Sequence, residues 1–247
     1  MIFLIIIGCL TMYSQKNEIS TNTKISDYLT VKQKKPKQNI KSIESMLSTQ
    51  TKKAIKKIKK CNKRTLHLKD YSLKTYNELI RYLDSSSNIG YENGIYIANI
   101  SLVKKRIKSV EKVNKILYKR VKKLYRGKTI RTLEAYELYI EDKIIYDISC
   151  PDMYKTMRKG TCISYATMLK AMCDISNIPC KIYAGWASPY DGHCWNRVKI
   201  KGKWYWVDLC WDDNTFCGDD SYMHSKRLWY DHEDYKPLTI YIVNLPY

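Results

Sequence analysis

A single hairpin brings together two side chains that could carry chemistry. His193 is one of four histidines in a chain with 22 tyrosines, and it is followed fifteen positions later by Asp208. The residues between them alternate as two strands, and Lys201-Gly202 is a turn signal. A turn centred on that pair would put His193 opposite Cys210 and diagonal to Asp208, whereas a turn one residue earlier would put His193 directly opposite Asp208. Both registers place the two side chains on one face, because side chains alternate along strands.

Cys162 is the candidate nucleophile. It follows Gly160-Thr161 and precedes a helical pattern from Ser164 to Ile175, so its thiol is expected at a helix N-terminus. There the peptide dipoles and free N–H groups favour an anion and lower the pKa of a cysteine below its usual ~8.5. A lone cysteine of this kind is more often a small buried residue.

Cysteine, histidine and aspartate together indicate thiol acyl-transfer chemistry. The aspartate would orient the imidazole, and the free ring nitrogen would take the thiol proton and later protonate the leaving amine. Taken singly, each residue type is more often structural; the joint reading is favoured because all three fit one mechanism. Four tryptophans near the hairpin would exclude water from this site, and Trp195 and Trp211 are the expected substrate-binding residues; the four are Trp195, Trp204, Trp206 and Trp211.

Three segments resemble the motif blocks of the transglutaminase-like superfamily, whose members have a papain-like thiol fold. The segments are Gly160-Thr-Cys-Ile-Ser-Tyr-Ala166, Gly192-His-Cys-Trp-Asn-Arg-Val198 and Trp204-Tyr-Trp-Val-Asp-Leu-Cys-Trp-Asp-Asp213. The resemblance implies Cys162 as nucleophile, His193 as base and Asp208 as the orienting carboxylate. It extends over about 133–235 and includes Tyr139 to Asp147, which looks like the helix and Tyr-Asp segment that precede the cysteine in many bacterial members.

The chain departs from this pattern at two places. Cys194 stands where a small residue such as alanine is usual, and Leu209-Cys210 replaces the commoner Pro-Thr. Extra thiols beside a nucleophilic cysteine could form a disulfide or compete for oxidants. The backbone N–H of Cys162 is one candidate oxyanion donor. The nine cysteines lack the closely spaced C-x-x-C pairs of a structural zinc site, so neither a metal nor another cofactor is expected.

The elements that must position these residues indicate an α+β fold, with the cysteine-bearing helix packed on an antiparallel sheet. Apolar residues recur at helical spacing in several segments, and shorter runs read as strands. The expected helices are 71–83, 102–124, 132–145 and 164–175, and the expected strands are 95–100, 181–184, 193–200 and 203–207.

The N-terminus has the character of an export segment. Its apolar run, Met1 to Cys9, is far shorter than the ~20 residues of a membrane-spanning helix. Ile6-Ile7-Gly8-Cys9 resembles a bacterial lipobox, which implies lipidation at Cys9. No Lys or Arg precedes the run, unlike the usual basic region of such signals. We expect an exported protein, either anchored in the cell envelope as a lipoprotein or secreted.

Positive charge is concentrated near the front of the chain. The net charge is +20, and residues 16–64 hold 15 Lys and Arg against 3 Asp and Glu, whereas residues 151–247 hold 12 against 11. The front composition predicts a disordered tether, with a solvated helix in the lysine-rich run 51–64. Loose contact with an anionic surface is expected there, and no specific nucleic acid. The expected organisation is an export segment (1–15), the basic tether (16–64), a helical extension (65–130) and a catalytic domain (131–247).

Two functions remain open from the sequence. The first is an enzyme acting on a protein or peptide amide, either a cysteine protease or a transglutaminase, because water and a lysine amine can resolve the same thioester. The second is a non-catalytic module that binds peptide or cell-wall polymer in an aromatic cleft. The presence of all three side chains favours the enzyme.

Overall fold

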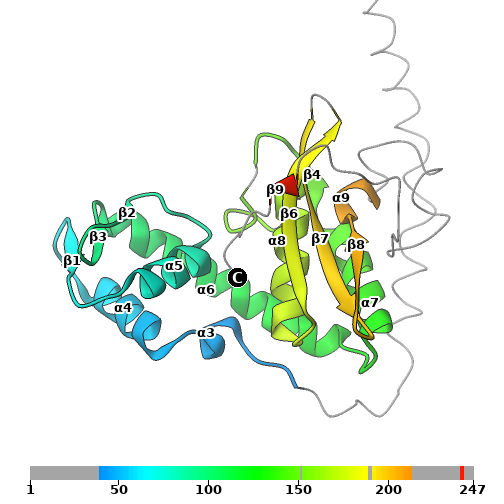
Figure 1. Cartoon of the computed structure of the whole chain (residues 1–247), viewed down its shortest axis with the longest axis horizontal. Coiled ribbons are helices and arrows are strands. Elements are labelled where there is room, and N and C mark those ends of the chain that lie inside the picture. Colours follow the sequence, from blue (N-terminus) through cyan, green and yellow to red (C-terminus); the bar gives the residue numbers. More distant parts are fainter. Residues whose placement is uncertain (1–38, 151, 189–190, 213–239, 242–247) are drawn as a thin grey trace, which may run out of the picture. The chain divides into compact units, whose positions relative to one another are not determined.

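The computed structural model describes residues 39–150, 152–188, 191–212 and 240–241 (Figure 1). Helices dominate up to residue 143, and most of the longer strands follow. The helices are α3 (Ile43–Met46), α4 (Thr49–Lys60), α5 (Leu73–Leu83), α6 (Ile100–Leu124), α7 (Thr129–Lys143), α8 (Cys162–Ile175) and α9 (Leu209–Asp212). The strands are β1 (Leu66–Leu68), β2 (Ile89–Tyr91), β3 (Ile95–Ile97), β4 (Ile145–Tyr146), β5 (Lys159–Gly160), β6 (Cys180–Ser188), β7 (Asp191–Ile200), β8 (Lys203–Val207) and β9 (Ile240–Tyr241).

The main sheet has the strand order β8-β7-β6-β9, and every neighbouring pair in it is antiparallel. Helix α8 packs against this sheet, as Figure 1 shows behind β6 and β7. A small antiparallel sheet, β1-β3-β2, lies among the N-terminal helices, and β4 and β5 form a short parallel pair. The predicted α+β class, with a helix that begins at the cysteine packed on an antiparallel sheet, is confirmed.

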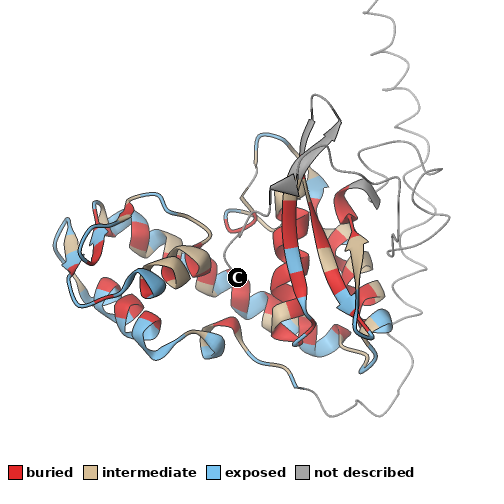
Figure 2. Ribbon diagram, viewed as in Figure 1, coloured by how far each residue is buried: buried red, intermediate tan, exposed pale blue. Residues whose placement is uncertain are grey.

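The face of the sheet toward α8 follows from strand alternation. On β7, Asn196, Val198 and Ile200 are buried at every second position. Asn196 contacts the backbone of α8, so the other two side chains share the face that this helix covers. Figure 2 shows the resulting buried layer between the sheet and the helix. The packing of these side chains fixes the position of α8 against β7.

Helix α8 is buried on nearly all sides, unlike a surface helix. Its residues from Ser164 to Cys173 are all buried, and most of them are apolar. The one charged side chain among them, Lys170, forms an ion pair with Asp174 one turn later. A helix without a polar stripe must lie in the centre of a domain. Its first residue, Cys162, is therefore fixed by packing on several sides.

Helix α6 shows the amphipathic pattern expected from the sequence. Its buried apolar residues are spaced by three or four positions, and lysines such as Lys108 and Lys115 are exposed. The buried apolar residues are Ile100, Val103, Ile107, Val110, Val113, Leu117, Val121 and Leu124. Asn99 caps the helix by accepting a hydrogen bond from the Leu102 N–H at 3.2 Å.

The described part of the expected tether, residues 39–64, differs from that expectation. Helix α4 buries Ala54, Ile55 and Ile58 along one face, and its lysines occupy the other. In addition, the Lys41 N–H donates to the Ile175 carbonyl oxygen at 2.9 Å. The lysine-rich composition suggested a solvated segment. However, a stripe of three apolar residues is enough to bury one face of a helix when a partner surface exists. The remainder of the expected tether, residues 16–38, lies outside the described residues.

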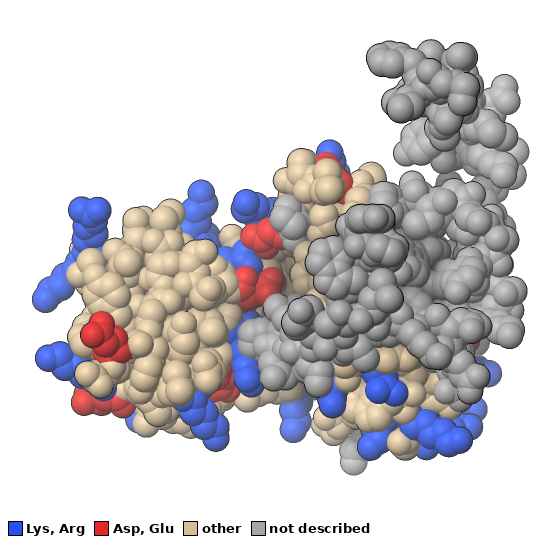
Figure 3. All heavy atoms as spheres, turned by 45° about the horizontal axis from the view of Figure 1, so that its top comes forward, with Lys and Arg blue, Asp and Glu red and all other residues tan. Residues whose placement is uncertain are grey.

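No helix among the described residues combines the length and the apolar character required to cross a membrane. Figure 3 shows Lys and Arg side chains on several parts of one face, with a group of them at the lower right. The expected export segment and Cys9 lie outside the described residues.

Candidate active site

The hairpin between β7 and β8 has the first of the two expected registers. Ile200 pairs with Lys203, so the turn is centred on Lys201-Gly202, and both turn residues have the positive φ of a type I′ turn. His193 Nε2 and Asp208 Oδ2 lie 2.6 Å apart. Both side chains are buried, with exposed fractions of 7% and 3%. The diagonal relation across the hairpin therefore becomes a buried hydrogen bond.

Cys162 is the first residue of α8, directly after the N-cap residue Thr161. Its side chain is half-buried and makes hydrogen-bonding contacts with the Cys194 side chain and the His193 ring. The Cys194 contact, together with the contact and positive charge of His193, outweighs burial and lowers the pKa of Cys162 to about 5. The sulfur is therefore a thiolate at neutral pH.

The pKa of His193 is shifted in the opposite direction, upward. Burial disfavours the charged ring, but the negative charge of Asp208, its hydrogen bond and the contact with Cys162 outweigh that effect and raise the pKa of His193 to about 10. Between these two values, thiolate and imidazolium coexist as an ion pair. Because Nε2 faces Asp208, Nδ1 is the ring nitrogen left to exchange a proton with the sulfur.

The start of α8 is held by the strands before it. Strand β5 pairs in parallel with β4, and the Asp147 N–H donates to the Gly160 carbonyl oxygen at 2.8 Å. A side chain at Gly160 would overlap Cβ and Oγ of Ser164, so the strand approaches the first turn of α8 very closely. Tyr165 adds a buried hydrogen bond from its hydroxyl to the Ile144 carbonyl oxygen at 3.0 Å. The Tyr-Asp segment noted in the sequence thus lies beside the strand that leads into Cys162.

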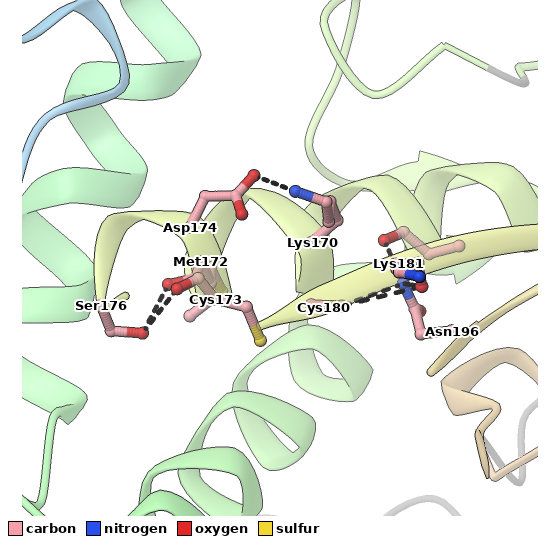
Figure 4. Close-up of polar contacts among 9 residues, drawn as sticks. Lys170, Met172, Cys173, Asp174, Ser176, Cys180, Lys181 and Asn196 are labelled. Atoms are coloured by element: carbon pink, nitrogen blue, oxygen red, sulfur yellow. Dashed lines mark hydrogen bonds and ion pairs between the residues drawn. The ribbon is translucent and has the colours of Figure 1, made fainter. Parts of the chain in front are cut away.

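Asn196 fastens the same helix to the sheet. Its Nδ2 donates to the Ala166 carbonyl oxygen at 3.0 Å and approaches the Lys181 carbonyl oxygen at 3.4 Å and Cys180 Sγ at 3.6 Å. Figure 4 shows this side chain beside Cys180 and Lys181 of β6, with dashed lines marking its contacts. Since Asn196 lies three residues after His193 and Ala166 lies four residues after Cys162, this contact helps to hold the thiol near the ring.

The tryptophans differ in their relation to the site. Trp195 is 1% exposed and lies nearly parallel to the His193 ring, with ring centroids 6.0 Å apart. Trp206 contacts Trp195 with a centroid distance of 6.1 Å, whereas Trp204 lies under the Lys181 ammonium. Trp211 belongs to α9, directly after Cys210 and three residues after Asp208 in the chain. The wall beside the imidazole is therefore aromatic, which limits access of water to the His193–Asp208 pair.

Sequence reasoning missed three side chains that hold or contact the site. Asn196 and Tyr165 were not singled out, and Cys194 was noted only as a departure from the usual pattern. The available signal was their position in the motifs: Cys194 directly follows His193, Asn196 directly follows Trp195, and Tyr165 lies three residues after Cys162. Within the described residues, no cluster of three or more His, Cys, Asp or Glu side chains is arranged to hold a metal ion.

Two solved structures are similar to parts of the chain. One is a crystal structure of a proposed cysteine protease from Cytophaga hutchinsonii, which is 23% identical, has a TM-score of 0.34 and covers 40% of this chain and 37% of its own. The other is a crystal structure of a TGase, which is 14% identical, has a TM-score of 0.38 and covers 66% of this chain and 53% of its own. The chain thus spans less than two thirds of either structure. A search of curated proteins found no match.

A protein-family comparison matches residues 111–209 to the model described as the transglutaminase-like superfamily. The matched segment runs from the middle of α6 to the start of α9 and contains Cys162, His193 and Asp208. This part of the chain is therefore similar to the transglutaminase-like superfamily, and the match covers less than half of the chain.

Proposed function

We propose that this protein is a thiol-dependent enzyme that cleaves or transfers the acyl group of a protein or peptide amide. The observation that carries this function is the contact of Cys162 with a histidine whose Nε2 lies 2.6 Å from Asp208 Oδ2. The superfamily match supports a thiol-dependent enzyme at the family level. The roles of the three side chains are part of the proposal.

The reaction begins with attack of the Cys162 thiolate on the amide carbonyl carbon. The oxyanion that forms lies near the N-terminus of α8, where backbone N–H groups lack helical partners, and the Cys162 N–H is one donor. His193 then gives its Nδ1 proton to the leaving amine, and Asp208 keeps the ring oriented. The product of this half-reaction is a thioester on Cys162.

The second half-reaction decides between hydrolysis and cross-linking. A water molecule that loses a proton to His193 would release a carboxylic acid, and a lysine amine would form a new amide. Of the two expected substrate-binding tryptophans, Trp195 is 1% exposed and stacks on His193, so its proposed role is to support the ring. Trp211, in α9 and three residues after Asp208, is kept as the proposed substrate contact.

The enzyme is tested by labelling the protein with iodoacetamide at about pH 6 and locating the label by peptide mapping. Because only the thiolate reacts, but low-pKa thiolates are intrinsically weaker nucleophiles, we expect Cys162 to react roughly 5–10-fold faster than an ordinary exposed thiol. Cys150, which is half-buried outside the site, is the internal reference. His193→Ala should remove the advantage, and His67→Ala, at an exposed histidine, should retain it.

Equal labelling of Cys162 and Cys150, unchanged by His193→Ala, would reject the enzyme and leave the non-catalytic binding module. If the advantage is seen, incubation with a glutamine-containing peptide and a fluorescent amine separates the two reactions. Incorporated amine identifies a transglutaminase, and release of ammonia or of a cleaved peptide without incorporation identifies a hydrolase. Cys162→Ala is the blank in both assays.

For the location of the protein, we propose export with lipid attached to Cys9, on the strength of the apolar run and the Ile6-Ile7-Gly8-Cys9 sequence. Contact of the basic segment 16–64 with an anionic surface is part of the same proposal. The mass of the mature N-terminal peptide tests the anchor. A retained Met1 or an unmodified Cys9 would reject lipidation.

A further inference from the structure

Two pairs of cysteines are in contact within the described residues. Cys162 at the start of α8 contacts Cys194 on β7, and Cys173 near the end of α8 contacts Cys180 at the start of β6. All four are free thiols in the structure. Each pair joins α8 to a neighbouring strand, so the two pairs differ mainly in their environment.

The environments of the two pairs predict opposite reactivity toward oxidants. Cys162 and Cys194 are both half-buried, whereas Cys173 and Cys180 are both buried. Contact with Cys194 and His193 lowers the pKa of Cys162, while burial, followed by contact with Cys180, raises the pKa of Cys173. Oxidation by a peroxide needs an accessible thiolate, which only the first pair supplies.

Cys194 is suited to react second. The hydrogen bond with Cys162, followed by burial, raises the pKa of Cys194, so it stays a protonated thiol beside the Cys162 thiolate. Its backbone also contacts the Cys162 side chain, which holds β7 against the start of α8 at this point. A thiol already in contact with an oxidised sulfur needs no large movement to attack it.

We propose that Cys162 and Cys194 form a reversible oxidation site, in which a hydroperoxide oxidises Cys162 and Cys194 then closes a disulfide with it. This inference rests on the proposed function only in that both need a reactive Cys162 thiolate. It adds a modification that switches the same site off and protects it from irreversible damage.

The chemistry balances in two steps. The Cys162 thiolate attacks one oxygen of the hydroperoxide; the O–O bond breaks, an S–O bond forms, and the departing oxygen leaves as water or an alcohol with a proton from the His193 imidazolium. The Cys194 sulfur then attacks the sulfenic sulfur, the S–O bond breaks, and the hydroxyl leaves as water with the thiol proton. The two thiols lose two electrons, which the hydroperoxide accepts.

The disulfide would remove the nucleophile, so activity and labelling of Cys162 stop together. A dithiol reductant would restore both. Without Cys194, a second peroxide would carry Cys162 to the sulfinic acid, which such reductants do not reverse. Recovery of labelling after reduction therefore shows whether Cys194 has closed a disulfide with the oxidised Cys162.

The test uses the full-length protein, treated with a small excess of hydrogen peroxide and then with dithiothreitol. Peptide mapping before reduction should find the Cys162 and Cys194 peptides joined, and Cys173 and Cys180 still reduced. Iodoacetamide labelling of Cys162 should fall to background with peroxide and return fully with dithiothreitol. Cys194→Ala should lose labelling with peroxide and fail to recover it.

Cys150→Ser is the matched control, because Cys150 is also half-buried but is not part of either pair. This variant should behave like the wild type. Alanine is the residue usual at position 194 in the superfamily that the sequence resembles, so Cys194→Ala is expected to fold, and circular dichroism checks this.

Three results would overturn the assignment: Cys162 joined to a different cysteine, such as Cys210 or Cys217; full recovery of labelling in Cys194→Ala; or a disulfide between Cys173 and Cys180 formed first. The mapping reads out the disulfide without any substrate. A protein that forms it but shows no acyl transfer would reject the proposed function and keep the oxidation site.

Discussion

Asn196 on β7 donates a hydrogen bond from Nδ2 to the Ala166 carbonyl oxygen of α8 at 3.0 Å. This contact helps to join the strand that carries His193 to the helix that begins at Cys162, beside the contacts of Cys162 with His193 and Cys194. Asn196 is 1% exposed, and its amide also reaches the Lys181 carbonyl oxygen. The distance between the sulfur and the imidazole thus depends on a side chain that takes no part in the proposed reaction.

Replacing Asn196 with alanine should weaken both the fold and the site. Loss of a buried hydrogen bond predicts a decrease of about 1–3 kcal/mol in the free energy of unfolding, measured by urea denaturation. The pH midpoint of Cys162 labelling should also rise, because the ring moves relative to the sulfur. Asn62→Ala, at an exposed asparagine, should change the stability by less than about 0.5 kcal/mol. A labelling profile unchanged in Asn196→Ala would show that the spacing is set elsewhere.

Labelling of Cys162 should follow the titration of a low-pKa thiol. Because its pKa is lowered to about 5, the rate should rise through that pH and then level off, whereas an ordinary thiol gains reactivity only around ~8.5. The iodoacetamide rate measured between pH 4 and pH 9 gives the midpoint. A midpoint near the ~8.5 of an ordinary thiol would contradict the thiolate–imidazolium pair.

Enzymatic activity should fall at high pH, whereas the rate of Cys162 labelling should not. The pKa of His193 is raised to about 10, so its proton is available to the leaving amine below that pH and is lost above it. Activity on a glutamine-containing peptide should therefore be high between about pH 5 and about pH 10 and fall on both sides. Loss of activity already near pH 6.5 on the alkaline side would mean that the histidine titrates as in an unfolded chain.

Asp208→Asn should lower the pKa of His193, because the negative charge that opposes burial is removed while burial remains. The raised pKa of the histidine stabilises the folded state fully below about 6.5, and this contribution is lost as the pH rises through about 10. The variant should lose that contribution at neutral pH and lose activity by roughly 10²-fold or more. NMR titration of the His193 ring measures the shift directly; a pKa that stays near 10 would contradict the role given to Asp208.

Gly160→Ala should displace the start of α8. The added carbon would overlap the Ser164 side chain, and relief requires the strand or the helix to move, at a cost of roughly 1–3 kcal/mol. Slower labelling of Cys162 should accompany the loss of stability. Gly90→Ala is the matched control, since an added carbon at Gly90 meets no atom within 4 Å. If both variants label and unfold like the wild type, the close approach at Gly160 does not position the thiol.

Local sequence patterns were sufficient to predict the helices and strands that have a single, regular spacing of apolar residues. The alternation of residues 203–207 predicted β8 with its observed bounds, and the apolar spacing in 102–124 predicted α6 to within two residues. The turn residues Lys201-Gly202 restricted the hairpin to two registers, one of which is observed. These predictions succeed because side-chain direction in a strand or helix depends only on sequence position.

The segment 39–64 could not be predicted in the same way. Its lysine content resembles that of a solvated tether, and its buried stripe of Ala54, Ile55 and Ile58 is short. Whether such a stripe is buried depends on a partner surface formed by residues far along the chain. Glu78 illustrates this, because its carboxylate accepts hydrogen bonds from the Ser48 and Thr51 hydroxyls across the α4–α5 contact.

By itself, the sequence determined which residue types could do chemistry and which of them share a strand face, since periodicity along one element settles both. Tertiary structure alone decided that the start of α8 lies against β7, so that Cys162 contacts both His193 and Cys194. Contacts between residues more than twenty positions apart depend on how helices and sheet pack, through links such as Asn196 to Ala166 and Tyr165 to Ile144. No local pattern encodes that packing, because each of these side chains finds its partner only when the whole core has formed.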